Sequence, residues 1–328
     1  MGLILSIIFG FIPMFVFAWF VYWLDRYEKE PKLLLGLVFF WGAVVAAGGA
    51  FLINTLLGLG VYMFTGSEGA TELTTGSLIA PIVEESLKGF AVLIVFMLFR
   101  REFDSLLDGI IYAAIAALGF AATENAYYIY QYGFVESGIG GLLWLVFVRV
   151  VLVGWQHPFY TSFTGIGLAS SRLSRNPGIR LLAPVAGWAL AVMTHSFHNT
   201  LTDLLQGPSG MVFGTVLDWG GWLLMFLFIV WVILQEQKAL AANLLEEVSL
   251  GILSERQYRT ACSAWAMNTA RFNALTAGRF QQTNRFYQVC AELAHKKNQR
   301  SRLGEEGDNS AIIERLRGEL AQLGPYVS

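Results

Sequence analysis

Seven long apolar runs constrain this chain more than any other feature of its sequence. They cover residues 3–24, 33–64, 77–99, 105–127, 150–171, 181–204 and 211–234. An α-helix needs about 20 apolar residues to cross a bilayer, where only helices and closed barrels satisfy their own backbone polar groups. The second run is long enough to be kinked or tilted. The sequence therefore predicts an all-α, polytopic membrane helix bundle of about seven transmembrane helices.

Charged residues divide the chain into two parts. Residues 1–237 hold 10 Lys and Arg against 15 Asp and Glu, whereas residues 238–328 hold 12 against 9. We therefore predict a transmembrane domain over 1–235 and a small C-terminal cytoplasmic helical domain, the tail, over 236–328. Neither part is basic enough to indicate a nucleic-acid partner.

The tail contains helix signals and no catalytic motif. Gly251 is typical of a helix stop, and Ser254 before Glu255 is typical of a helix N-cap. We expect helices over 258–293 and 310–323, separated by a polar linker over 298–309. The only two cysteines lie in this tail, so the sequence indicates no disulfide framework.

Basic residues alternate between the links that join the runs, and this alternation predicts the orientation. The links after the first, third and fifth runs are basic, and they hold Arg26, Lys29, Lys32, Arg100, Arg101, Arg172, Arg175 and Arg180. The intervening links hold no Lys or Arg apart from Arg149. We place Arg149 at the outer end of the fifth span, with residues 140–148 in the membrane interface. We expect a cell-membrane protein with its N-terminus outside and its tail in the cytoplasm.

Polar residues interrupt four of the apolar runs. They are Glu84, Glu85, Lys88, Glu124, Asn125, His157, His195, His198 and Asn199. A central charge costs about 2.5 to 3.5 kcal/mol even on the most lenient insertion scale, so these groups should face the bundle interior or a water-filled cavity. At about 1.5 Å of rise per residue, Glu84, Glu124, His157 and His195 all reach a similar depth from the outer surface. The sequence therefore predicts one polar cluster.

Helical spacing indicates which of these residues share a face. Glu84 and Lys88 are four residues apart, as are Phe120 and Glu124, and His195 and Asn199. A stripe of small residues, Gly109, Ala113, Ala117 and Ala121, would let another helix approach the fourth span closely. We expect this span to be central.

The chemistry of the predicted cluster suits activation of water. Adjacent carboxyl groups in a low-dielectric pocket cannot both keep ordinary protonation states, so one of Glu84 and Glu85 can act as a base. His195 and Asn199 could donate hydrogen bonds to an oxyanion. His198 is expected to point elsewhere.

Other interpretations are excluded or stay open. The metalloprotease pattern H-E-x-x-H is absent. Residues 207–210 imitate the G-x-S-G motif of rhomboid serine proteases, but the only histidine after them is His295 in the tail, so no base can reach Ser209. A zinc site built from His157, His195 and Glu124 is an open alternative, because these ligand types suit zinc. A proton- or ion-coupled transporter and a non-catalytic membrane sensor are the alternative functions, although the internal repeats typical of transporters are absent.

The polar motifs resemble those of the PrsW family of intramembrane proteases. Residues 84–88 (EESLK) resemble its E-E-x-x-K motif, and residues 120–125 (FAATEN) its F-x-x-x-E-N motif. His157 in HPFYTSFTGIGLA is similar to the third motif, and residues 195–199 resemble H-x-x-x-N. Residues 25–31 (DRYEKEP) resemble the family's first cytoplasmic loop. The resemblance covers roughly 1–205 and leaves out the tail.

The resemblance implies a glutamate-dependent peptidase that uses no metal or other cofactor. The family belongs to a clan with the prenyl-CAAX endopeptidases and bacteriocin-processing proteins. By this resemblance Glu84 is the base, Glu85 its partner, and His195 with Asn199 the oxyanion donors.

The remaining motif residues receive more general roles. CAAX enzymes carry His where this chain has Glu124, so His157 is the alternative water-holding group, while Lys88, Phe120 and Asn125 support the site. The implied substrate is a membrane-anchored protein, such as an anti-sigma-factor-like regulator, cut near the extracytoplasmic side.

Overall fold

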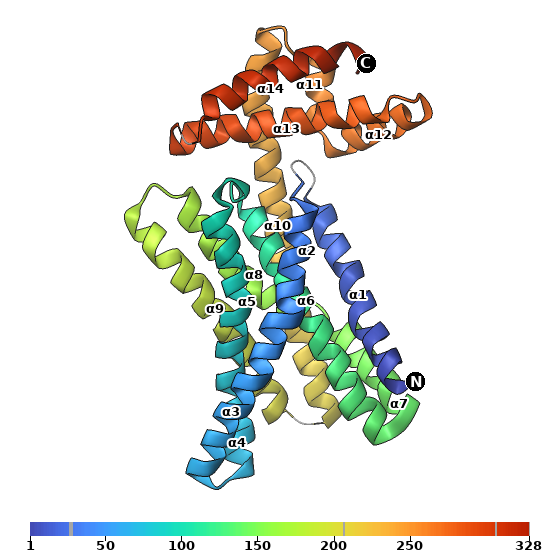
Figure 1. Ribbon diagram of the computed structural model, residues 1–328, viewed down its shortest axis with the longest axis vertical. Helices are drawn as coiled ribbons and strands as arrows, with labels where there is room; N and C mark the ends of the chain where they lie inside the picture. Colours follow the sequence, from blue (N-terminus) through green and yellow to red (C-terminus); the bar gives the residue numbers. More distant parts are fainter. Residues whose placement is uncertain (26–28, 206, 306, 328) are drawn as a thin grey trace. The chain divides into compact units, whose positions relative to one another are not determined.

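The computed structural model describes residues 1–25, 29–205, 207–305 and 307–327, and these contain helices and no strand (Figure 1). The chain forms two compact units, one comprising Met1–Leu24 and Glu30–Phe228 and the other built mainly from Ile229 onward. The prediction of an all-α helical bundle is confirmed. Residues 26–28 of the predicted first cytoplasmic loop lie outside the described residues.

The first unit, the bundle, contains most of the helices. In chain order they are α1 (Gly2–Leu24), α2 (Lys32–Phe40), η1 (Trp41–Ala46), α3 (Ala47–Thr65), α4 (Glu68–Thr74), η2 (Thr75–Ile79), α5 (Ala80–Leu98), η3 (Arg100–Glu102), α6 (Leu106–Tyr128), η4 (Ile129–Phe134), α7 (Val135–Val146), η5 (Phe147–Leu152), α8 (Gln156–Leu173) and α9 (Pro177–Leu204). The long helix α10 (Gly207–Ser249) begins in this unit and continues beyond it.

Five helical segments of the described chain are long and apolar enough to cross a membrane, namely Gly2–Leu24, Lys32–Thr65, Leu106–Leu173, Pro177–Leu204 and Ser209–Ser249. The segment Leu106–Leu173 includes both the fourth and the fifth predicted runs, because helical turns continue through most of the connection between α6 and α8. Helix α5 is not among the five, although it is 19 residues long. It contains Glu84, Glu85 and Lys88, and these charges lower its apolar character.

The predicted fifth span, 150–171, needs a correction. The chain leaves the helical conformation at Val153 (φ −124°, ψ 10°) and at Trp155 (φ −98°, ψ 2°), and α8 begins only at Gln156. Residues 150–155 are all apolar residues or glycine, so hydropathy does not indicate this break in the helix. The break places His157 in the first turn of α8.

Helix α6 packs against neighbours on several sides, as the small-residue stripe predicts. A Cβ atom added at Gly109 would overlap the carbonyl oxygen of Gly165 in α8, and one added at Gly119 would overlap that of Phe39 in α2. The stripe residues Ala113 and Ala117 are completely buried. Figure 1 shows α6 among α1, α2, α5 and α8, all of which it contacts. The prediction that this helix is central is confirmed.

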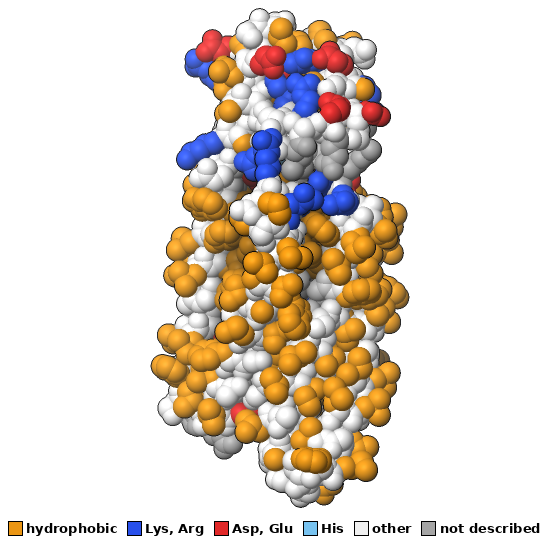
Figure 2. All heavy atoms as spheres, turned by 90° about the vertical axis from the view of Figure 1, so that its left-hand side faces the viewer, with side chains coloured by type: hydrophobic (Ala, Val, Ile, Leu, Met, Phe, Trp, Pro, Cys, Tyr) orange, Lys and Arg blue, Asp and Glu red, His pale blue; other side chains and the backbone are white. Residues whose placement is uncertain are grey.

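The surface of the bundle is apolar. Figure 2 shows hydrophobic side chains covering most of the bundle surface on the face drawn. Large apolar side chains such as Leu33, Phe64 and Leu181 are 78%, 94% and 74% exposed. Apolar side chains exposed over several helices indicate a lipid-facing surface.

The second unit contains the end of α10 with α11 (Glu255–Ala261), α12 (Ala264–Thr276), α13 (Phe280–Leu303), α14 (Asn309–Leu323) and η6 (Gly324–Tyr326). The helix stop at Gly251 (φ 68°) and the N-cap at Ser254 are confirmed, and the Ser254 hydroxyl accepts a hydrogen bond from the Gln257 amide. The predicted helix 258–293 is wrong in its bounds. Ser263 caps a new helix and Gly278 (φ 68°) adopts a left-handed turn, so the run is divided among three helices.

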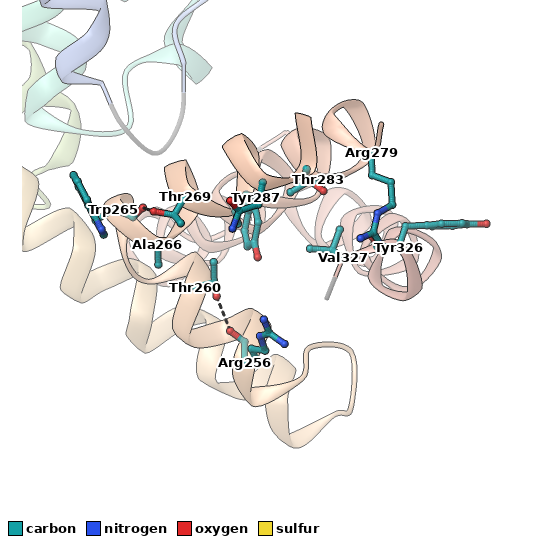
Figure 3. Close-up of a pocket in the computed structure, with 13 residues that line it drawn as sticks. Arg256, Thr260, Trp265, Ala266, Thr269, Arg279, Thr283, Tyr287, Tyr326 and Val327 are labelled. Carbon is teal, nitrogen blue, oxygen red and sulfur yellow. Dashed lines mark hydrogen bonds between the residues drawn. The ribbon is translucent and has the colours of Figure 1, made fainter. Parts of the chain in front are cut away.

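The predicted linker 298–309 is also shorter than expected, because α13 continues to Leu303. A core of side chains from α10, α11, α12, α13 and α14 holds this unit together. Both cysteines are free, and burial raises the pKa of the Cys290 thiol. A cavity of about 400 Å³ lies among these helices, and Figure 3 shows Arg256, Tyr287 and Arg279 in its wall.

Candidate active site

The centre of the polar cluster is a buried ion pair on α5. Lys88 Nζ lies 2.6 Å from Glu85 Oε1, and both side chains are completely buried. Glu85 also accepts hydrogen bonds from Thr161 Oγ1 of α8 at 2.8 Å and contacts His195 Nδ1 of α9 at 2.9 Å. Glu85 is therefore a fully partnered carboxylate that joins α5 to α8 and α9.

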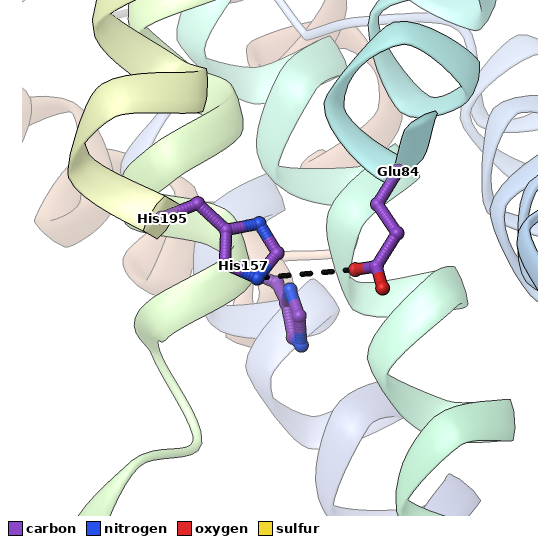
Figure 4. A group of neighbouring side chains, drawn as sticks. All are labelled: Glu84, His157 and His195. Carbon is purple, nitrogen blue, oxygen red and sulfur yellow. Dashed lines mark ion pairs between the residues drawn. The ribbon is translucent and has the colours of Figure 1, made fainter. Parts of the chain in front are cut away.

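Glu84 has a different environment, although it is the preceding residue. Its Oε2 atom is buried and has no hydrogen-bond partner among the described residues. The same atom lies 3.9 Å from His195 Nε2 and 3.9 Å from Lys88 Nζ, distances too long for direct hydrogen bonds. In Figure 4, Glu84 and His195 point toward one another beside His157.

His157 is held through both of its ring nitrogens. Nδ1 lies 3.2 Å from Lys88 Nζ, and Nε2 lies 2.8 Å from Glu124 Oε2. Because Lys88 donates, Nδ1 accepts and Nε2 carries the hydrogen that Glu124 accepts. The ring of Phe120 lies under the Lys88 ammonium, 4.4 Å from ring centroid to Nζ, and meets the His157 ring edge to face.

Arg149 is a site residue that the sequence prediction missed. Its guanidinium forms an ion pair with Glu124, and its Nε donates to Asn125 Oδ1 at 2.8 Å. It also lies over the Tyr128 ring, 4.1 Å from the centroid. The sequence identified Arg149 as an isolated basic residue at the outer end of a span, and this unusual position was the available signal.

Asn199 and His198 complete the set on α9. Asn199 donates from Nδ2 to the carbonyl oxygen of Gly76 at 2.8 Å. His198 does not point away from the cluster as expected. Its Nδ1 lies 3.1 Å from Asp218 Oδ1 of α10, and Gln156 Nε2 donates to Asp218 Oδ2 at 2.6 Å. The two residues lie 20 positions apart on the successive helices α9 and α10. No helical spacing joins them, so the sequence did not predict the His198–Asp218 pair.

One cavity of about 1040 Å³ connects these residues. Its wall includes residues of η2, α5, α6, α8, α9 and α10, among them Glu84, Glu124, His157, His195, Asn199 and Asp218. Glu85 and Lys88 lie behind this wall and hold it in place. The structure thus brings the predicted residues of four spans together.

Glu84, His157 and His195 also form a possible metal-ligand set. One ligand atom from each residue lies within 4.8 Å of those of the other two. Two histidines and a glutamate are the protein ligands of several catalytic zinc sites. The buried, unpartnered Glu84 oxygen fits this donor set. The predicted zinc alternative had Glu124 as its third ligand, but Glu124 instead pairs with Arg149 and His157.

A protein-family model supplies the decisive comparison. The model described as "PrsW family intramembrane metalloprotease" matches residues 30–234, more than half of the chain. The chain belongs to the PrsW family. This match includes the helices that form the cavity and ends before the predicted tail. The resemblance inferred from the four motifs is confirmed, and the family places the chain among the intramembrane peptidases.

Three curated PrsW relatives are similar to this chain. Protease PrsW of Bacillus subtilis (strain 168) is 26% identical over 222 residues, which are 68% of this chain and 88% of the relative. Protease PrsW of Geobacillus kaustophilus (strain HTA426) is 25% identical over 222 residues, which are 68% of this chain and 85% of the relative.

Protease PrsW of Clostridioides difficile (strain 630) is 36% identical over 121 residues, 37% of this chain, and that match spans about half, 48%, of the relative. No solved structure matches the chain significantly.

Proposed function

We propose that this chain is a glutamate-dependent endopeptidase that hydrolyses a membrane-anchored protein, with Glu84 as the base that activates water. The observation that supports this most strongly is the buried Glu84 Oε2 atom, which has no hydrogen-bond partner among the described residues and lies 3.9 Å from His195 Nε2. A separation above 3.5 Å between two polar atoms leaves place for a bridging water. Both residues line the same cavity.

Glu85 positions His195 in this proposal. The Glu85 carboxylate accepts the hydrogen of His195 Nδ1, so the neutral ring keeps its lone pair at Nε2. That nitrogen accepts a hydrogen bond from the water and orients it. The donor role that the resemblance gives to His195 would need a second proton on the ring.

The reaction then follows ordinary acid–base chemistry. Glu84 takes a proton from the water as the water oxygen bonds to the scissile carbonyl carbon, and the carbonyl electron pair moves to its oxygen. Collapse of this tetrahedral intermediate breaks the C–N bond. The proton on Glu84 passes to the leaving nitrogen, and the products are a carboxyl group and an amine.

The surrounding charges keep these groups in place. Lys88 neutralises Glu85 and donates to His157, while Arg149 neutralises Glu124. Glu84 differs from these two carboxylates, because its buried Oε2 atom has no hydrogen-bond partner among the described residues.

The residues of the cavity wall support the proposed side of cleavage. Its wall includes Gly76, Leu205 and Gly207, which lie in links without Lys or Arg. Such links face the outside by the positive-inside rule. We therefore place the N-terminus outside and residues 236–328 in the cytoplasm of a cell membrane. Cleavage occurs near the extracytoplasmic side, in a protein such as an anti-sigma-factor-like regulator.

Comparison of strains tests this proposal in cells. Cells expressing the Glu84→Gln variant should accumulate at least one uncut membrane-anchored protein that wild-type cells cleave, because glutamine cannot accept the proton. Quantitative proteomics of membrane fractions, with labelling of new N-termini, identifies the protein and the cut bond. Glu68→Gln makes the same chemical change at an exposed glutamate of α4 and should leave processing normal.

Identical membrane proteomes in wild-type and Glu84→Gln cells would contradict the proposal. Accumulation in both variants would also contradict it, because the effect would not depend on the cavity.

A metal-dependent reaction is the second candidate, favoured by the Glu84–His157–His195 set and by the family's description. A divalent ion held by these residues would supply Lewis-acid polarisation of water or of the carbonyl. Metal content and chelator treatment of the purified chain separate the two candidates. The glutamate-dependent proposal predicts cleavage that persists in chelator. Loss of cleavage in chelator, with recovery on adding zinc, would favour the second candidate.

A further inference from the structure

Tyr160 is a buried cavity residue to which neither the motifs nor the family resemblance gave a role. It lies in α8, one turn after His157, and is 2% exposed. Its ring stacks on His195 with centroids 4.8 Å apart and an interplanar angle of 18°. Tyr160 belongs to the wall of the 1040 Å³ cavity, together with Glu84 and His195.

The Tyr160 hydroxyl lies inside the protein. Its oxygen is buried and has no hydrogen bond to any described residue. A buried tyrosine hydroxyl normally has a hydrogen-bond partner, and each exception in a native structure needs an explanation. A ligand that enters the cavity and accepts a hydrogen bond would provide one.

Three other polar residues of the cavity wall already use hydrogen-bonding atoms on protein partners. His195 Nδ1 is directed to Glu85, so its Nε2 is an acceptor in the neutral ring. Asn199 uses an Nδ2 hydrogen on the carbonyl oxygen of Gly76. Gln156 Nε2 contacts Asp218 and His198. The hydroxyl of Tyr160 is a buried neutral donor that has no acceptor among the described residues.

We infer that Tyr160 is a catalytic residue whose hydroxyl donates a hydrogen bond to the oxygen of the scissile carbonyl. This inference rests on the proposed function. When water adds to the carbonyl carbon, the carbon–oxygen π pair moves to that oxygen, and the hydroxyl stabilises the negative charge while keeping its own proton. A fixed donor in a site that excludes water contributes most where charge develops in the transition state. Stacking on His195 fixes the ring.

The variant Tyr160→Phe tests the inference because it keeps the stacked ring and removes only the hydroxyl. We expect kcat to fall about 100-fold or more, as for the loss of an oxyanion donor, with KM and the melting temperature of the purified chain nearly unchanged. The substrate is the membrane protein that accumulates uncut in Glu84→Gln cells. Tyr62→Phe removes a hydroxyl from an exposed tyrosine of α3 and serves as the matched control.

The outcomes separate this inference from the proposed function. Wild-type kcat in Tyr160→Phe, with Glu84→Gln inactive, would overturn the inference and leave the proposed function in place. A lower melting temperature or a raised KM at unchanged kcat would give the hydroxyl a packing or binding role and would also overturn it. Full activity of Glu84→Gln would instead refute the proposed function.

Discussion

The two adjacent glutamates show how much residue identity leaves open. Successive helical side chains point about 100° apart, so Glu85 turns toward His195 and Thr161 while Glu84 faces the cavity. The E-E pattern predicted that the pair would lie at the site. Which glutamate has the unpartnered oxygen depends on α8 and α9, and no local pattern encodes these contacts.

At the residue scale, Arg149 gives a testable prediction. Arg149→Met leaves Glu124 without its cation and frees His157 to shift, and a displacement of about 1 Å can cost about 100-fold in rate. The substrate is the membrane protein that accumulates uncut in Glu84→Gln cells. We expect kcat for its cleavage to fall at least about 10-fold. Arg149→Lys keeps a positive charge and should retain more activity than Arg149→Met.

The control for this prediction is Arg180→Met, at an exposed arginine in the first turn of α9. It should cleave at the wild-type rate. Wild-type kcat in Arg149→Met would show that the ion pair does not position the site.

At the element scale, the sequence predicted some helices better than others. Helix α6 matches its predicted span because Ser105 and Asp108 form a capping box at its start and a run of small residues fixes its packing face. Helix α8 differs from its predicted span because the chain leaves the helical conformation at Val153 and Trp155, inside an apolar run that hydropathy does not divide. In α5, the charged residues Glu84, Glu85 and Lys88 mark the site. The same three residues lower the hydropathy by which a membrane span is recognised.

The approach of α6 to α8 provides the prediction at this scale. Gly165→Ala puts a methyl group against the Gly109 carbonyl oxygen. Both groups belong to helix backbones, which have little freedom to move apart. Overpacking of this kind costs about 1–3 kcal/mol. The melting temperature of the purified chain in detergent should fall, and cleavage should fall with it, because α6 and α8 hold Glu124 and His157.

Gly36→Ala in α2 makes the same change at a position where no atom lies within 4 Å of the new Cβ. Its melting temperature should equal or slightly exceed that of the wild type, since alanine favours a helix more than glycine does. Equal melting temperatures for the two variants would refute the tight α6–α8 contact.

At the scale of the whole molecule, the sequence separated an apolar bundle from a polar tail but did not predict what stabilises the tail. Glu247 of α10 is completely buried, with Lys297 Nζ of α13 at 2.6 Å and Arg317 Nη2 of α14 at 2.9 Å. These partners lie 50 and 70 residues away in sequence, and no helical periodicity joins them.

This cluster predicts a large effect of a single substitution in the tail. Glu247→Ala removes the buried partner of Lys297 and Arg317, although both cations keep the more exposed Glu246 carboxylate at 2.7 and 3.3 Å. The cost should therefore lie below the value of about 3–5 kcal/mol for breaking a buried ion pair that has no other partner. Amide hydrogen exchange of the full chain in detergent should show faster exchange across α13 and α14.

Arg259→Ala breaks the exposed pair between Arg259 and Glu255, whose side chains are 75% and 69% exposed. Exposed pairs contribute about 0.2–1 kcal/mol, so exchange in the tail should change little. Equal exchange in the two variants would contradict a stabilising role for the Glu247 cluster.

The central claim is that Glu84 activates the water that cleaves the substrate. The most direct test measures kcat for the purified wild-type chain and for Glu84→Gln, at equal amounts of folded protein. Each is reconstituted in lipid vesicles together with the membrane protein that accumulates uncut in Glu84→Gln cells. Loss of a general base costs about 100-fold to 10,000-fold in rate. We predict that kcat of Glu84→Gln is at least about 100-fold lower than that of the wild type, while Glu68→Gln cleaves at the wild-type rate. A Glu84→Gln variant that cleaves within a few-fold of the wild-type rate would contradict the account.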